Sequence, residues 1–179
     1  MERITACLIA LAITSSSTFA QTPAPRRVGL VDYVKAGHAG VTRDLLAAAE
    51  RMPEADYAFK PSTMPEARTY AAVIAHAADG MFDACARAKE VANPHPDVEK
   101  TLTAKTPIVK ALAESIALCN DVFSSLTDQT AQEYVRQGPA EVPRIAALMG
   151  LLAHNAEMYG ISTVYLRAKD LVPPASERR

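Results

Sequence analysis

Three histidines lie on seam positions of predicted helices, where an imidazole can bind a metal ion, transfer a proton or form a buried hydrogen bond. His154 and Met158 belong to a stripe whose members recur at spacings of four and three, typical of an inward-facing helix seam: Ala147, Leu151, His154, Met158, Ile161 and Tyr165. His38 falls on the apolar face of the first predicted helix, and His76 on a second seam of the next one, with Asp79 one turn later. The pattern alone does not distinguish these roles.

Four long amphipathic segments are available to position these side chains. The spacing of apolar residues predicts helices over residues 31–52, 69–91, 106–126 and 143–172. Thr69 can cap the second helix, Pro107 and Pro143 mark starts, and Pro53 ends the first. No alternating run bounded by turn residues predicts a hairpin. We therefore expect an all-α protein, a four-helix bundle with a longer connection before the last helix.

The composition limits the function classes. The chain has 179 residues, enough for one domain, with 19 Lys and Arg against 20 Asp and Glu. The sequence has no basic face, so we do not expect it to bind nucleic acid.

We divide the chain into a signal peptide (1–20), a proline-containing linker (21–27), the bundle (28–172) and a flexible tail (173–179). The apolar run at residues 4–13 is shorter than a bilayer-spanning helix, so we expect cleavage, a periplasmic or secreted protein and no stable membrane insertion.

Two cysteines remain after the predicted cleavage removes Cys7. Cys85 and Cys119 both fall on inward faces of consecutive helices, and an oxidising compartment permits a disulfide between them. The alternative is two buried free thiols that pack as small apolar side chains.

Several short motifs, taken in order along residues 30–176, resemble the DinB family. They are Met52-Pro53-Glu54 with Tyr57, Phe59 and Pro61; Arg68 and His76; His154-Asn155-Ala156-Glu157 with Tyr159-Gly160; and Tyr165-Leu166-Arg167 with Val172-Pro173-Pro174. The resemblance implies a four-helix bundle, for which we expect an up-down-down-up arrangement. It also implies a divalent metal, often zinc or nickel, and for some relatives transfer or isomerisation of low-molecular-weight thiols. Many relatives have no known activity, and dimerisation is common among them.

Carried onto this sequence, the family's ligand positions are His76, His154 and Met158. The third position is a histidine in the family, and a thioether is a weak, soft donor for zinc. Three hypotheses follow: Met158 packs in the core and no metal is bound; a third ligand comes from Asp79, Glu157 or His38; or His76, His154 and Met158 bind copper.

The leading functional hypothesis is a metal-dependent enzyme of the thiol-transferase or hydrolase type acting on a small-molecule substrate. Its metal would act as a Lewis acid that activates a thiol or water. Glu157 can serve as a general base beside such a site, or it can be a solvated glutamate. The alternative function is a non-catalytic bundle that binds a small ligand or forms a homodimer.

Overall fold

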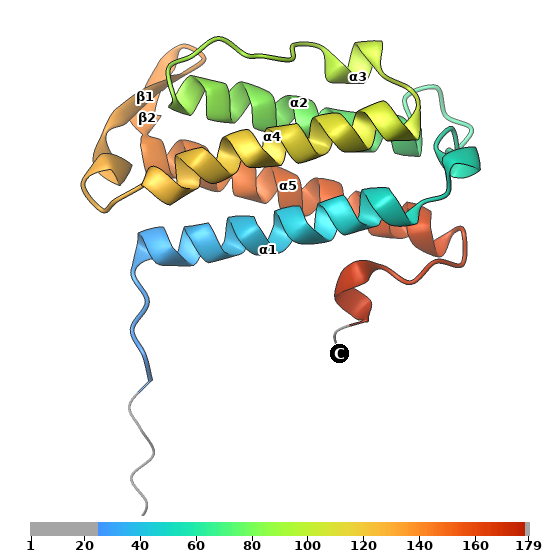
Figure 1. Cartoon of the computed structure of the whole chain (residues 1–179), viewed down its shortest axis with the longest axis horizontal. Helices are drawn as coiled ribbons and strands as arrows, with labels where there is room; N and C mark the ends of the chain where they lie inside the picture. The colour runs from blue at the N-terminus through green and yellow to red at the C-terminus, as the bar shows by residue number, and fades with distance from the viewer. Residues whose placement is uncertain (1–24, 178–179) are drawn as a thin grey trace, which may run out of the picture.

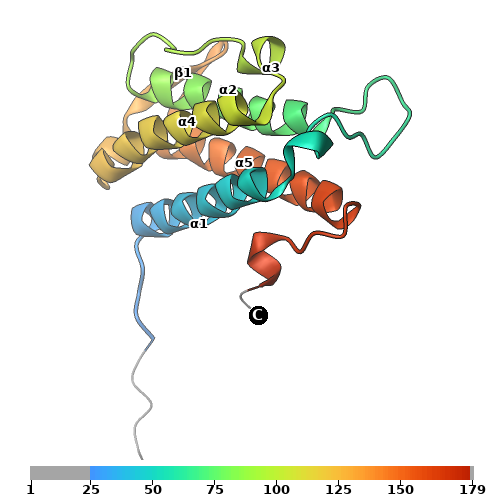
Figure 2. The ribbon, with the colours of Figure 1, turned by 45° about the vertical axis from the view of Figure 1, so that its right-hand side comes forward.

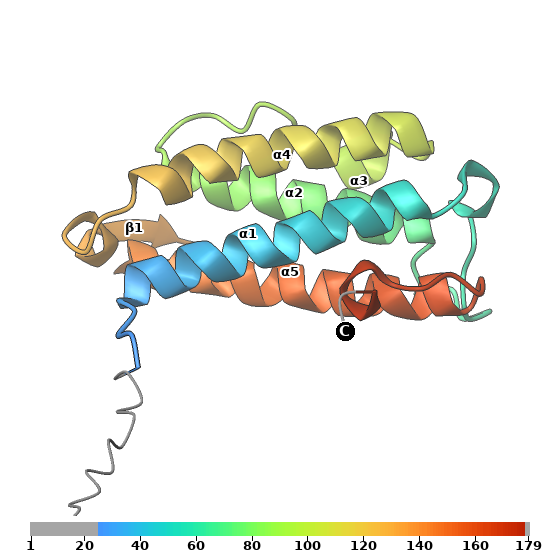
Figure 3. The ribbon, with the colours of Figure 1, turned by 60° about the horizontal axis from the view of Figure 1, so that its bottom comes forward.

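Four long helices lie side by side in the computed structural model, which describes residues 25–177 (Figure 1). They are α1 (Leu30–Arg51), α2 (Tyr70–Ala88), α4 (Lys105–Ser125) and α5 (Arg144–Arg167). α1 and α5 run in one direction and α2 and α4 in the other, and both α1 and α2 pack against α4 and α5 (Figures 1 and 3). The expected all-α bundle with up-down-down-up order is confirmed.

The helix boundaries follow the local signals in the sequence. The Thr69 hydroxyl accepts a hydrogen bond from the Ala72 amide at 3.1 Å and so caps α2. Pro143 precedes the first residue of α5, and α1 ends two residues before Pro53. The predicted seams supply part of the core, and neighbouring positions supply the rest. Its largest fully buried side chains include Leu45, Met52, Tyr57, Tyr70, Ile74, Met81, Phe82, Ile108, Leu112, Leu148 and Leu166. Burial of these faces is the main force that holds the bundle together.

The connection between α2 and α4 returns the chain along the bundle, because these consecutive helices run in the same direction. We call residues 89–104 the crossover; it contains the short helix α3 (Val98–Thr101) and lies on the outer side of α2 (Figure 2). The connection at residues 52–69, with η1 (Glu54–Asp56), is as long as the one at residues 126–143. The expectation of a distinctly longer connection before the last helix was therefore wrong.

The last connection contains a hairpin that the sequence analysis did not predict. After η2 (Thr130–Gln132), strands β1 (Tyr134–Gln137) and β2 (Ala140–Pro143) pair antiparallel, with Gln137 opposite Ala140. Gly138 in the tight turn has φ +60°, a conformation that glycine adopts without a steric penalty. Each strand has four residues, too few for an alternating pattern to be recognised.

The residues after Pro173, expected to form a flexible tail, pack against the bundle up to Glu177. They form η3 (Pro174–Ser176), which lies beside α1 (Figure 3). Pro174 is buried, and the Ala175 amide donates to the Tyr159 hydroxyl at 3.0 Å. Arg51 of α1 forms an ion pair with Glu177 at 2.7 Å. The predicted signal peptide and most of the predicted linker lie outside the described residues. Within residues 25–177, no helix combines the length and apolar character needed to cross a membrane.

Candidate metal site

His76, Asp79 and Asp83 form an outward-facing stripe of α2, and their side chains hold the crossover in place. Asp79 accepts hydrogen bonds from the backbone amides of Val98 at 2.7 Å and Glu99 at 2.8 Å. Its carboxylate thus satisfies two amides at the start of α3, where negative charge is favourable. One turn further along α2, Asp83 accepts a hydrogen bond from the Asn93 side chain at 2.6 Å. These contacts fix the position of Glu99.

Glu99 reaches back to the histidine on the same stripe. Its Oε2 lies 2.7 Å from His76 Nδ1, and its Oε1 accepts a hydrogen bond from Arg68 Nε at 2.8 Å. Partial burial favours the neutral acid, but the hydrogen bonds from Arg68 and His76 outweigh it and lower the pKa of the Glu99 carboxyl. An ionised carboxylate only accepts hydrogen bonds, so His76 Nδ1 carries the proton. In the neutral ring, Nε2 then retains a lone pair.

The second imidazole comes from α5. The ring centroids of His154 and His76 are 5.1 Å apart, and the ring planes make an angle of 62°. His154 packs closely against α2 because residue 80 is glycine; a Cβ there would lie 2.9 Å from His154 Cε1. His154 Nδ1 is buried and has no hydrogen-bond partner among the described residues. Burial and the nearby His76 lower the pKa of His154, which favours the neutral ring.

The other candidate ligands lie in different surroundings. Met158 is 5% exposed and belongs to the apolar core cluster, Glu157 is exposed, and both oxygens of Asp79 are taken by the α3 amides. Within residues 25–177, no group of three or more His, Cys, Asp or Glu side chains is arranged to hold a metal ion. His38 therefore does not complete a three-ligand set with His76 and His154. Met158 is the remaining third donor from the sequence analysis, and as a ligand it stays a prediction.

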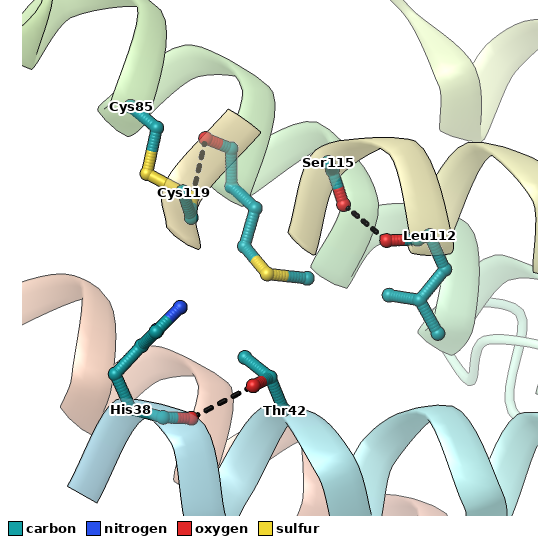
Figure 4. The surroundings of a disulfide bond; sticks show 7 residues. His38, Thr42, Cys85, Leu112, Ser115 and Cys119 are labelled. Atoms are coloured by element: carbon teal, nitrogen blue, oxygen red, sulfur yellow. Dashed lines mark hydrogen bonds between the residues drawn. A yellow bond between two sulfur atoms is a disulfide. The ribbon is translucent and has the colours of Figure 1, made fainter. Parts of the chain in front are cut away.

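His38 instead lies near the disulfide in the bundle interior. It points from α1 towards α4, as does Thr42, near Cys119 and Ser115 (Figure 4). Its ring stacks on Phe123 with centroids 3.9 Å apart and planes 7° from parallel, and it is 1% exposed. Neither ring nitrogen meets a hydrogen-bond partner in the described part of the chain. Burial lowers the pKa of His38, although the neighbouring Asn120 side chain acts in the opposite direction.

Cys85 of α2 and Cys119 of α4 form a disulfide, with their Cα atoms 5.2 Å apart (Figure 4). Both cysteines are fully buried. The bond joins the two parallel helices and closes a loop that includes the crossover. Of the two alternatives for these cysteines, the structure shows the bridge.

Glu99 is the site residue that the sequence analysis missed. It lies 23 residues after His76, in a short helix that depends on Asp79 for its cap. The local signal was weak: an Asp-Val-Glu sequence after a proline-containing loop marks a helix start but does not identify the neighbour that the glutamate meets.

The model of the DinB superfamily matches residues 39–158. Among curated proteins, none matches the chain. The fold is similar to a crystal structure of a DinB-like protein from Bacillus cereus, with a TM-score of 0.69, 15% sequence identity, and coverage of 79% of this chain and 93% of the other. It is also similar to a DinB-like protein from Bacillus subtilis, with a TM-score of 0.60, 15% identity, and coverage of 78% and 93%.

Proposed function

Since this chain belongs to the DinB superfamily, we propose that His76 and His154 bind a transition-metal ion and that the protein is a metal-dependent enzyme of the thiol-transferase or hydrolase type. The observation that carries the proposal is the His76–Glu99 contact beside a second imidazole. A carboxylate on the far nitrogen of a histidine is a recurring companion of metal ligation, because it fixes the tautomer and orients the ring.

The side chains at the site suit this role in part. Imidazole nitrogens are good donors for zinc, nickel or copper, and the buried Nδ1 of His154 has no competing hydrogen bond among the described residues. Met158, one helical turn from His154, supplies a soft thioether where a third nitrogen is usual. With a thioether in place of a third imidazole, we expect zinc to bind more weakly and copper to be better suited to the site.

The residues around the site orient the His76 ring and influence the charge of the His154 ring. Glu99 accepts a hydrogen bond from His76 Nδ1, which leaves Nε2 as the ring nitrogen that can bind a metal, and Arg68 keeps the Glu99 carboxylate in place. Burial lowers the pKa of His154 and so favours the neutral ring, which does not repel a cation. A bound metal ion supplies Lewis acidity, which lowers the pKa of a thiol or water.

Calorimetric titration of untagged, metal-free protein with zinc, nickel and copper tests the proposal. We expect one ion per chain for the wild type and loss of binding in His154→Ala. His95→Ala is the matched control: His95 is an exposed histidine that contacts Phe82 and Glu114, and its loss should leave binding unchanged. Met158→Leu should leave zinc binding unchanged if the thioether only packs, and weaken copper binding if it is a ligand.

Glu99→Gln tests the orienting role separately. The amide keeps the shape of the side chain but loses the charge, and we expect metal affinity to fall about 10- to 100-fold with little change in melting temperature. Wild-type protein that binds none of the three metals, with a melting temperature that none of them shifts, would contradict the metal site.

A non-catalytic bundle that binds a small ligand or forms a homodimer is the second candidate. It is favoured by the burial of Met158 and by the lack of a third His, Cys, Asp or Glu ligand within residues 25–177. If the titrations show no metal binding, the non-catalytic bundle becomes the supported function.

We also propose that the protein is exported to the periplasm or secreted. The buried Cys85–Cys119 bond supports this, because disulfides persist in oxidising compartments. Cell fractionation followed by thiol labelling under denaturing conditions tests it. Native protein in the cytoplasmic fraction that retains Cys7 and carries Cys85 and Cys119 as reactive thiols would contradict export.

A further inference from the structure

A hollow of about 200 Å³ lies between the crossover and the first turn of α2. Its walls are mainly apolar, with Ala58, Ala71, Ala72 and Leu102. Three polar side chains complete the lining: Thr69, Thr103 and Glu99. The crossover therefore does not close completely on α2; it leaves a partly open space at its end near α4.

The hollow adjoins the histidine site through a shared residue. Glu99 lines the hollow and also bonds His76 Nδ1 at 2.7 Å. Ala72 precedes His76 by one helical turn, so both lie on the same face of α2. A molecule in the hollow would thus have one end next to Glu99, the residue that bonds His76.

The size and charge of the hollow indicate what it can accept. A cavity of about 150 Å³ is enough for a benzene ring, so this one suits a single ring or a short aliphatic chain. Glu99, its single charged lining residue, already accepts hydrogen bonds from Arg68 and His76. A charged group placed in the hollow would lose its hydration without meeting an unpaired opposite charge. We therefore expect neutral groups to bind there better than charged ones. The Thr69 hydroxyl accepts from the Ala72 amide, whereas Thr103 offers a hydroxyl at the rim.

We propose that this hollow is the substrate pocket of the histidine site and that it binds a neutral, mainly apolar group of one ring or a short chain. The polar end of such a substrate then lies at Glu99, whose carboxylate contacts His76. The inference rests on the proposed function for the identity of the reacting site, but binding in the hollow requires no metal.

Benzyl alcohol is a suitable probe, since it combines one apolar ring with a hydroxyl group. Titration of metal-free, ¹⁵N-labelled protein followed by NMR should shift the amide signals of Ala72, Leu102 and Thr103. Benzoate and benzylamine, which share the ring but carry a charge, should bind at least several-fold more weakly. Shifts confined to another part of the protein, or equal binding of all three probes, would overturn the proposal.

Ala72→Leu should fill the hollow and weaken benzyl alcohol binding at least tenfold. Ala117→Leu, at an exposed position of α4, is the size-matched control and should bind like wild type. If Ala72→Leu does not fold, Thr103→Val replaces it, with an expected loss of a few-fold in affinity for benzyl alcohol and none for toluene. Unchanged binding in the folded Ala72→Leu protein, or in Thr103→Val where that variant is used, would refute the pocket.

The same variants separate this inference from the metal proposal. Ala72→Leu should keep the zinc, nickel or copper affinity of wild type, because it removes no donor. Benzyl alcohol binding without any metal binding would contradict the proposed function alone. Metal binding without benzyl alcohol binding would contradict the pocket alone.

Discussion

The two faces of α2 hold their neighbours by different interactions. The outer face binds the crossover through polar side chains: Asp79 caps α3, and His76 bonds Glu99. The inner face packs in the core and is joined to α4 by the Cys85–Cys119 disulfide. His76 lies on the outer face and has a carboxylate partner, whereas His38 lies on α1 in the same core and stacks on Phe123 of α4.

This difference shows that burial of a histidine does not by itself indicate chemistry. His38 is the more deeply buried of the two, yet none of its described neighbours fixes a tautomer or directs a nitrogen towards a ligand. His76 is 32% exposed in its side chain, but its Nδ1 is fixed and a second imidazole lies beside it. The outer face therefore has the organisation of a reactive site, and the inner face that of a structural core.

The largest effect is expected from loss of the disulfide. Replacing both Cys85 and Cys119 by Ala should lower the free energy of unfolding by about 4 kcal/mol, because the unfolded chain is no longer constrained by a bond across 34 residues of sequence separation. Urea denaturation measures this loss. Metal affinity of the folded variant should stay unchanged if the two faces of α2 are independent. A loss of metal binding in a fully folded variant would contradict that independence.

Substitution of His38 should change stability and not metal binding. His38→Ala removes the ring that stacks on Phe123 and should cost about 2–4 kcal/mol, as other large-to-small core changes do. His38→Leu keeps most of the volume and removes the unpaired nitrogens, so at pH 8 it should lie within about 1 kcal/mol of wild type.

The pH dependence of stability sharpens the His38 comparison. The pKa of His38 is lowered in the folded protein, so below the ordinary value of 6.5 the unfolded chain binds a proton that the folded chain resists. Wild-type stability should therefore be unaffected by this group above pH 6.5 and fall as the pH drops below it. His38→Leu should lose less stability over that range in denaturation experiments. Equal pH dependence of the two proteins would show that His38 is not protonated on unfolding in this way.

The helices could be predicted from sequence because each depends on local periodicity, whereas the disulfide stayed one of two alternatives because it depends on how closely two helices approach. The seam positions of Cys85 and Cys119 placed both cysteines inside the bundle, and Thr69 marked the start of α2 before the structure showed its capping bond. The hairpin was missed because two four-residue strands are too short to establish an alternation.

The site was predictable only in its imidazoles. His76 and His154 were placed together by resemblance to a family, and their rings do meet. The role of Glu99 depends on the path of the crossover, which in turn depends on Asp79, so no local pattern could pair Glu99 with His76. Asp79 illustrates the same limit: the sequence marked it as a possible ligand, and the structure shows a helix cap.

The smallest effect is expected from a change in the spacing of α2 and α5. In Gly80→Ala, the added Cβ would lie 2.9 Å from His154 Cε1, closer than carbon atoms normally approach. The His154 ring is the end of a flexible side chain, so it should turn aside and leave the fold intact. We expect metal affinity to fall about tenfold, or about 1.4 kcal/mol, measured by the same calorimetric titration.

Gly150→Ala in α5 is the matched control, since a Cβ at Gly150 would meet nothing within 4 Å. Alanine is the better helix former by about 0.5–1 kcal/mol, so this variant should gain stability and bind metal like wild type. Gly80→Ala shares the same propensity gain, and any loss of binding must therefore come from the displaced ring. If both variants bind metal equally well, the contact with Gly80 does not set the position of the His154 ring for metal binding. The two faces of α2 would then differ only in how they pack against their neighbours.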